Sequence, residues 1–111
     1  MTFNLGPALL FCPADRPERF RGALEKADAV IIDLEDAVLP EAKAGARQNL
    51  IEADLDPDRV IVRVNAPDSA AFTADLATLA QTDLRTVMVA KTESAESLSA
   101  FDESFSLVAL C

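Results

Sequence analysis

The sequence contains no histidine, and it has only three glycines and two cysteines among its 111 residues. The missing histidine removes the usual acid–base group near neutral pH and the commonest ligand of transition metals. Any chemistry must therefore run on carboxylates, arginine, lysine or cysteine. Cys12 and Cys111 lie far apart and match no metal or redox spacing. Because Cys12 lies in an apolar run, we expect it to be a buried and unreactive thiol.

Basic residues are also few, since ten Lys and Arg stand against nineteen Asp and Glu, for a net charge of −9. A field of that sign repels a phosphate backbone, so we expect no nucleic-acid partner, although a local anion site stays possible. The first residues carry no basic leader or long apolar segment, and we expect no membrane contact and a cytoplasmic location. Length and a hydrophobic share of 50% predict a single domain over residues 1–111.

Apolar runs alternate along the chain with segments of helical periodicity. We predict five strands, near 9–13, 29–35, 59–65, 86–90 and 106–110. We predict four helices, over 16–27, 40–55, 69–82 and 94–105, the first two opened by a proline. Nearly continuous apolar strands separated by amphipathic helices indicate an all-parallel sheet that is covered by helices.

Parallel βα units build either a (β/α)₈ barrel or an open, doubly wound sheet. The open sheet usually carries a glycine-rich phosphate turn after its first strand, but here that turn reads CPADRPER. We therefore predict an α/β fold, the N-terminal part of a TIM (β/α)₈ barrel with about five strands and four helices. A complete barrel takes about 200 residues or more, so we expect half a barrel. A small flavodoxin-like domain that binds an anion is the weaker alternative.

Charged or polar residues follow each of the first four predicted strands. They are Asp15 and Arg16, then Asp33, Glu35 and Asp36, then Arg63 and Asn65, and then Lys91 and Glu93. Functional residues of parallel α/β folds gather at these carboxyl ends. Some of these charged residues can also have a purely structural role. Asp15 can cap a helix, and Lys43 and Arg47, four apart on a predicted helix, resemble solvated surface charges.

Arg63 is harder to explain as a surface residue. Strand alternation in VIVRVN puts it on the same face as Ile61, which predicts that it points into the barrel near its mouth. Burying an unpaired guanidinium costs several kcal/mol, so we expect Asp33, Glu35 or Asp36 to pair with it. Two interpretations remain open: an internal salt bridge, or an arginine that binds a substrate carboxylate.

Four segments carry a family resemblance: LLFCPADRPERF, AVIIDLEDAVLPEAKAGAR, VIVRVNAPDS and TVMVAKTESAESL. In order and spacing they resemble the citrate lyase beta subunit-like proteins of the HpcH/HpaI aldolase and malyl-CoA lyase superfamily. The resemblance covers essentially the whole chain and corresponds to the N-terminal portion of such proteins. It implies a TIM barrel assembled into trimers or hexamers. It also implies a Mg²⁺-dependent carbon–carbon lyase or condensing activity on acyl-CoA thioesters or small 2-oxo or 3-hydroxy acids.

The resemblance also implies roles for five residues. Arg63 would bind the substrate carboxylate or carbonyl, and Arg16 would lie near the coenzyme A phosphates. Glu35 and Asp36 would form an acidic pair at the mouth of the barrel, with Asp36 bonded to metal-bound water or orienting Arg63. Lys43 would pair with these acids and help to bind the substrate.

Two departures from the family pattern bear on these roles. Pro7 and Ala8 stand where many relatives carry Arg-Ser or Arg-Thr, which counts against acyl-CoA recognition. The family's metal-binding glutamate and aspartate would follow Cys111, so we expect no direct metal ligand within this chain and no lyase activity of the chain alone. The alternative is a non-catalytic, degenerate half-barrel that acts as a binding or self-association module.

Overall fold

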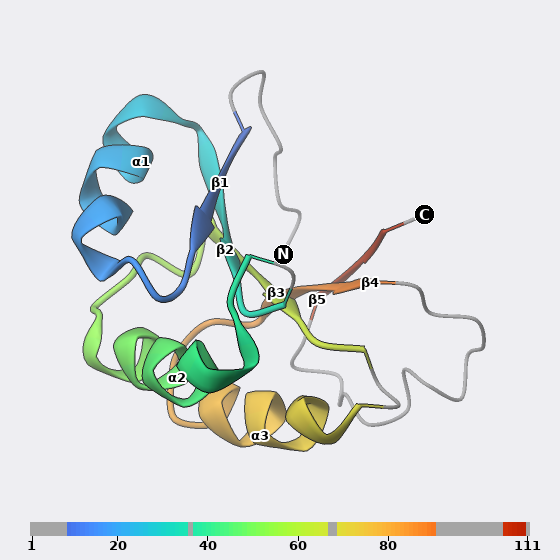
Figure 1. The fold of residues 1–111 in the computed structure, drawn as a ribbon. Coiled ribbons are helices and arrows are strands. Elements are labelled where there is room, and N and C mark those ends of the chain that lie inside the picture. The colour runs from blue at the N-terminus through green and yellow to red at the C-terminus, as the bar shows by residue number, and fades with distance from the viewer. Residues whose placement is uncertain (1–8, 36, 67–68, 91–105, 111) are drawn as a thin grey trace.

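The computed structural model describes residues 9–35, 37–66, 69–90 and 106–110. Five strands form one sheet in the order β1-β2-β3-β4-β5, and every neighbouring pair is parallel (Figure 1). The strands are β1 Leu9–Pro13, β2 Ala29–Asp33, β3 Val60–Val64, β4 Thr86–Ala90 and β5 Ser106–Leu110. The predicted all-parallel sheet is confirmed, with β2 ending earlier, and β3 shorter at both ends, than the apolar runs suggested.

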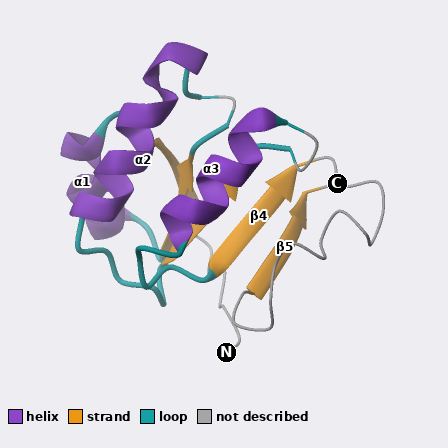
Figure 2. Ribbon diagram, turned by 90° about the horizontal axis from the view of Figure 1, so that it is seen from below, coloured by secondary structure: helices purple, strands orange, loops and turns teal. Residues whose placement is uncertain are grey.

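The described helices cover one face of this sheet (Figure 2). They are α1 Phe20–Lys26, α2 Lys43–Glu52 and α3 Ala70–Leu79, with short 3-10 turns η1 Pro17–Arg19 and η2 Pro40–Ala42 leading into the first two. Both turns open with proline, whose missing N–H is not needed in a first turn. The predicted helix at 94–105 lies outside the described residues. No helix in the described ranges is long and apolar enough to cross a membrane.

Strand alternation divides the apolar side chains between two clusters. The larger one fills the space between sheet and helices, and its main strand members are Cys12, Val30, Ile32, Val60, Val62, Val64, Val87 and Val89. The smaller one, on the opposite face of the sheet, consists of Ile31, Ile61 and Met88. Strands that are apolar on both faces read as continuous hydrophobic runs, which is why the sequence pattern located them. Asp33 and Arg63 continue the second face.

Cys12 belongs to the larger cluster and is 2% exposed. Burial raises the pKa of its thiol, although the nearby Arg19 acts in the opposite direction. A buried thiol with a raised pKa forms little thiolate, which is the reactive species. The predicted burial of Cys12 is confirmed, and its low reactivity stays a prediction.

Strand order separates the two architectures that the sequence left open. A flavodoxin-like sheet has the order 2-1-3-4-5 and carries helices on both faces. Here consecutive strands are direct neighbours throughout, and the described helices lie on one face. This is the βα arrangement of a TIM barrel, in which every helix lies outside the ring of strands. The flavodoxin-like alternative is wrong, and the prediction of part of a TIM-type barrel is confirmed.

Candidate substrate-binding site at the carboxyl ends of the strands

A buried pair of opposite charges joins the ends of β2 and β3. Asp33 and Arg63 are register partners in the parallel ladder. Arg63 Nε donates to Asp33 Oδ1 at 2.9 Å, and Nη2 donates to Oδ2 at 2.5 Å. Their side chains are only 2% and 13% exposed. Two parallel hydrogen bonds fix the plane of the guanidinium. The prediction that a strand-end carboxylate pairs with Arg63 is confirmed, with Asp33 as the bidentate partner.

Asp33 also holds the segment that follows β2. The backbone N–H groups of Glu35 and Ala37 donate to its two carboxylate oxygens at 2.8 and 3.1 Å. Burial alone would raise the pKa of Asp33, but the hydrogen bonds from Arg63, Glu35 and Ala37 outweigh it and hold this pKa below the ordinary value. Asp33 is therefore ionised near neutral pH and ties the loop to the Arg63 guanidinium.

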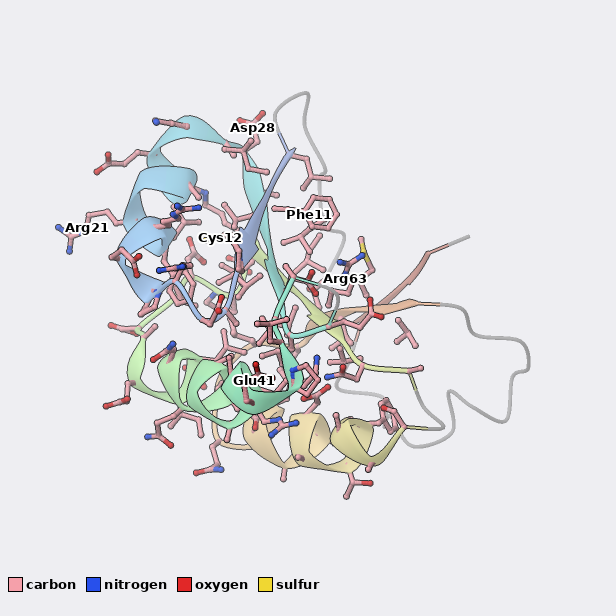
Figure 3. The ribbon with its side chains drawn as sticks, in the orientation of Figure 1. Phe11, Cys12, Arg21, Asp28, Glu41 and Arg63 are labelled. Atoms are coloured by element: carbon pink, nitrogen blue, oxygen red, sulfur yellow. The ribbon has the colours of Figure 1, made fainter. Side chains whose placement is uncertain are left out.

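Glu35 and Phe11 flank the same guanidinium. Glu35 Oε1 lies 3.7 Å from Arg63 Nε. The guanidinium carbon of Arg63 lies 5.3 Å from the centroid of the Phe11 ring, and Figure 3 shows the two side chains near each other. A carboxylate and an aromatic face both favour a cation. The predicted acidic neighbour Glu35 is thus beside Arg63, whereas Asp36 lies outside the described residues and its role stays a prediction.

Lys43, at the start of α2, reaches the backbone of the loop that follows β2. Its Nζ donates to the carbonyl oxygens of Leu34 and Glu35 and to Asn65 Oδ1, each at 2.9 Å. Three such bonds engage all three hydrogens of the ammonium group. Lys43 therefore contacts Glu35 through its carbonyl oxygen, and a direct contact of Lys43 with substrate stays a prediction.

The sequence pattern misjudged the charged face of α2. The alternative interpretation of Lys43 and Arg47 as solvated surface charges is wrong. Arg47 Nε donates to Asp75 Oδ1 at 2.9 Å, and the Asp75 side chain is fully buried. Asp75 Oδ2 in turn accepts from the backbone N–H and the Nδ2 of Asn65, at 2.8 and 2.7 Å. Both cations of α2 therefore point toward the ends of the strands.

Asp75 was not recognised as a site residue from the sequence, although a signal was present. It shares a helical face of α3 with Phe72 and Leu79 at i, i+3 and i+7 spacing, and all three are buried. A charge on the apolar face of a helix needs a partner in the interior. That partner could not be named from the sequence, because Arg47 lies 28 positions away.

Arg16 lies in the turn after β1, at the same end of the sheet. Its side chain is exposed. It occupies the N-cap position of η1, and neither η1 nor α1 has a side-chain cap hydrogen bond. The interpretation of Asp15 as a helix cap is therefore wrong. The role of Arg16 beside coenzyme A phosphates stays a prediction.

The described residues of this site offer no set of ligands for a divalent metal. Among residues 9–35, 37–66, 69–90 and 106–110, no group of three or more His, Cys, Asp or Glu side chains could hold a metal ion. Both carboxylate oxygens of Asp33 already accept hydrogen bonds from Arg63 and from backbone N–H groups. The described residues therefore do not make a magnesium site.

A hollow of about 630 Å³ lies away from this charged group. Its walls come from α1, α2 and the segment before β3, and include Phe20, Leu24 and Leu55. Arg21 also lines it and extends outward from α1 in Figure 3. Arg63 is not part of this hollow. We place the candidate site at the carboxyl ends of the strands, because functional residues of parallel α/β folds gather there and Arg63 is held there by Asp33.

These features define a TIM-barrel-type α/β protein with an arginine–carboxylate site at the carboxyl ends of its strands. The chain belongs to the HpcH/HpaI aldolase/citrate lyase family, whose model matches residues 8–108. The resemblance seen in the four sequence segments is thereby confirmed.

Two curated relatives illustrate the similarity. The citrate lyase subunit beta-like protein of Mycobacterium tuberculosis is 53% identical over 90 residues, which cover 81% of this chain and 33% of that protein. The L-malyl-CoA/beta-methylmalyl-CoA lyase of Cereibacter sphaeroides is 37% identical over 118 residues, covering 92% of this chain and 37% of that protein. The chain therefore spans about a third of the length of the curated relatives it matches.

A solved structure agrees with the same relationship. The crystal structure of protein CitE from Mycobacterium tuberculosis in complex with magnesium and pyruvate matches with a TM-score of 0.88 and 46% identity, over 96% of this chain and 45% of that chain. A second CitE structure, with magnesium, acetoacetate and coenzyme A, matches with a TM-score of 0.87 and 46% identity, over 97% of this chain and 40% of that one.

Proposed function

We propose that the chain supplies the substrate-binding part of a Mg²⁺-dependent carbon–carbon lyase. Its reaction is an aldol-type cleavage or condensation of acyl-CoA thioesters or small 2-oxo or 3-hydroxy acids. The observation that carries the proposal is the position of Arg63, held by Asp33 on the inner face of the sheet at the strand ends. The relatives support it, because they include a malyl-CoA lyase and a citrate lyase beta-like protein.

Arg63 has the chemistry that this reaction needs from a cation. Cleavage breaks the bond between the carbon that bears the hydroxyl group and the neighbouring α-carbon. The electron pair passes to the α-carbon and its carbonyl as an enolate, while the hydroxyl group gives its proton to a general base and becomes a carbonyl. The enolate then takes up a proton at the α-carbon, which completes the cleavage. A guanidinium that Asp33 already orients can bind the substrate carboxylate or carbonyl and stabilise this charge without first reorganising. We assign Glu35 and Asp36 to the acidic neighbourhood that orients Arg63.

Magnesium would polarise a substrate oxygen and help to stabilise the enolate. The CitE structures are complexes with magnesium. Because the described residues include no ligand group for a metal, we place the direct ligands of magnesium outside them and derive no step through the ion. Arg16, exposed in the turn after β1, is our candidate contact for coenzyme A phosphates.

Calorimetric titration of oxaloacetate into the 111-residue chain tests the proposal. We expect weak binding that declines as salt is raised, since the attraction is between charges. Arg63→Gln should weaken it roughly tenfold or more, because a hydrogen-bonded charge pair is lost. Arg21→Gln is the matched control, since it removes an exposed guanidinium that extends outward from α1. Equal affinity of wild type and Arg63→Gln would refute the assignment of Arg63.

A lyase assay with L-malyl-CoA and Mg²⁺ forms the second arm of this experiment. We expect no turnover by the 111-residue chain, because the family resemblance puts the metal-binding glutamate and aspartate after Cys111. Turnover that is abolished both by EDTA and by Arg63→Gln would show that the chain holds the metal, contrary to our placement of its ligands.

A further inference from the structure

A continuous set of hydrogen bonds lies behind the Arg63–Asp33 pair and connects it to two helices. It runs from Arg47 on α2 to Asp75 on α3, from Asp75 to Asn65 after β3, and from Asn65 to Lys43 at the start of α2. We call these four residues the inner polar network. Asp75 is fully buried and Asn65 is 6% exposed, so both depend on these partners for their hydrogen bonds.

The network ends on the loop that carries the site. Lys43 Nζ binds the carbonyl oxygens of both Leu34 and Glu35 at 2.9 Å, and Asn65 Nδ2 binds the Leu34 carbonyl oxygen at 3.1 Å. The same short segment donates its Glu35 N–H to Asp33, the partner of Arg63. The loop is thus held from one side by its carbonyl oxygens and from the other by an N–H group.

We propose that Lys43, Asn65 and Asp75 are positioning residues, which fix the Leu34–Glu35 backbone so that Asp33 and Glu35 hold Arg63 in the orientation that binds a substrate carboxylate. The effect on substrate binding rests on the proposed function, whereas the hydrogen bonds that hold the loop do not depend on it. A buried set of charges often contributes little net stability compared with apolar residues of the same volume. Such a set of charges can instead restrict a segment to a single conformation, and here that segment is the loop beside Arg63.

Asp75 gives the sharpest test. In the described part of the chain its side chain accepts hydrogen bonds from Arg47 and Asn65, and of these two residues it is Asn65 that donates to the loop. Amide hydrogen exchange of the peptide covering residues 34–38, read by mass spectrometry, reports on the loop directly. Four of its N–H groups, those of Leu34, Glu35, Ala37 and Val38, donate hydrogen bonds in the wild type. We expect Lys43→Met and Asp75→Asn each to speed exchange of this peptide roughly tenfold or more.

Two controls separate positioning from general destabilisation. Lys26→Met makes the same chemical change at an exposed lysine of α1 and should leave the exchange unaltered. Leu50→Ala opens a cavity in the apolar core and should speed exchange of β3 and the loop alike. The inference is overturned if Lys43→Met and Asp75→Asn behave like either control. Should Lys43→Met fail to fold, Asp75→Asn, which keeps the side-chain volume, decides alone.

Binding of oxaloacetate supplies the second measurement. If the network positions Arg63, both variants weaken binding at temperatures where circular dichroism shows them folded. The double variant should weaken it by less than the sum of the two single effects, since Lys43 and Asn65, the residue that Asp75 holds, both donate to the Leu34 carbonyl oxygen. Faster amide hydrogen exchange of the loop with unaltered affinity for oxaloacetate would overturn the claim that the network orients Arg63. A wild type that binds no oxaloacetate, but whose variants show faster loop exchange, would refute the proposed function and leave the positioning of the loop established.

Discussion

Asp33 explains how a buried apolar strand can end in a carboxylate. A charge taken out of water is tolerated only when it is paired and hydrogen-bonded. Asp33 accepts two bonds from Arg63 and one each from the N–H groups of Glu35 and Ala37. One side chain therefore joins two strands and the loop between β2 and α2. Its removal should be costly because Arg63 would then lack its bidentate partner.

The lowered pKa of Asp33 predicts a specific pH dependence of stability. The unfolded chain takes up this proton near the ordinary value of about 3.9, and the folded chain only at lower pH. The stabilisation is therefore complete above that value and is lost as the pH falls through the lower, folded-state pKa. Asp33→Asn should lower the free energy of unfolding at pH 7 by about 3 kcal/mol. It should also flatten the dependence of that free energy on pH below about 4.

Urea unfolding of wild type and Asp33→Asn, followed by circular dichroism between pH 3 and pH 7, measures both effects. Asp54→Asn is the control, because this aspartate is exposed in the loop after α2. Parallel pH profiles for wild type and Asp33→Asn would contradict the account of Asp33 as the ionised centre of the site.

Helix ends in this fold are closed by arginines that directly precede strands. Arg59, before β3, donates to carbonyl oxygens at the end of α1, those of Leu24 and Ala27. Arg85, before β4, donates to the Leu79 carbonyl oxygen at the end of α3. The last carbonyl groups of a helix lack partners within it and carry partial negative charge. Both arginines lie at the amino ends of the strands, opposite the candidate site, where residues serve stability.

Removal of either arginine should therefore cost stability and spare binding. We expect Arg59→Met and Arg85→Met each to lower the free energy of unfolding by about 1–3 kcal/mol, since charged hydrogen bonds to partly buried carbonyl groups are lost. Oxaloacetate affinity should not change. Arg21→Met, at an exposed position of α1, should change stability by less than about 0.5 kcal/mol. The account of these helix ends fails if all three variants are equally stable.

The molecule as a whole exposes apolar side chains along one edge of its sheet. Among the described residues, Leu9, Leu10 and Phe11 of β1 are 36%, 39% and 55% exposed. β1 is the first strand in the sheet order and has one strand neighbour, β2, within the described part. An apolar edge strand is a template for pairing with another chain. This feature favours the alternative that the 111-residue chain acts as a self-association module.

We accordingly expect the 111-residue chain to be oligomeric or poorly soluble. Leu10→Lys should shift it toward the monomer, because an edge charge opposes strand pairing. Leu39→Lys is the matched control, since Leu39 is 65% exposed but lies in the loop before η2. Light scattering measures the mass of each variant. A sharp monomer peak for the wild type, with a cooperative thermal transition, would contradict the prediction.

The sequence by itself determined the five strands, their parallel arrangement and the face on which Arg63 lies. Apolar runs, helical periodicity and two helix-opening prolines are local signals, and each depends on residues close together in the chain. The requirement that Arg63 have an anionic partner also followed from the sequence, because a buried guanidinium cannot remain unpaired.

Only the tertiary structure decided which groups meet. Strand register selects Asp33, and not Glu35, as the bidentate partner of Arg63. The packing of α2 against α3 brings Arg47 to Asp75 across 28 positions of sequence. Periodicity in the sequence indicates which face of a helix or strand a residue occupies, but not which element packs against that face. A hydrogen bond depends on that packing, because it requires its two atoms to lie within about 3 Å of each other. The inner polar network, built from such long-range contacts, therefore left no pattern in the sequence from which its pairings could be predicted.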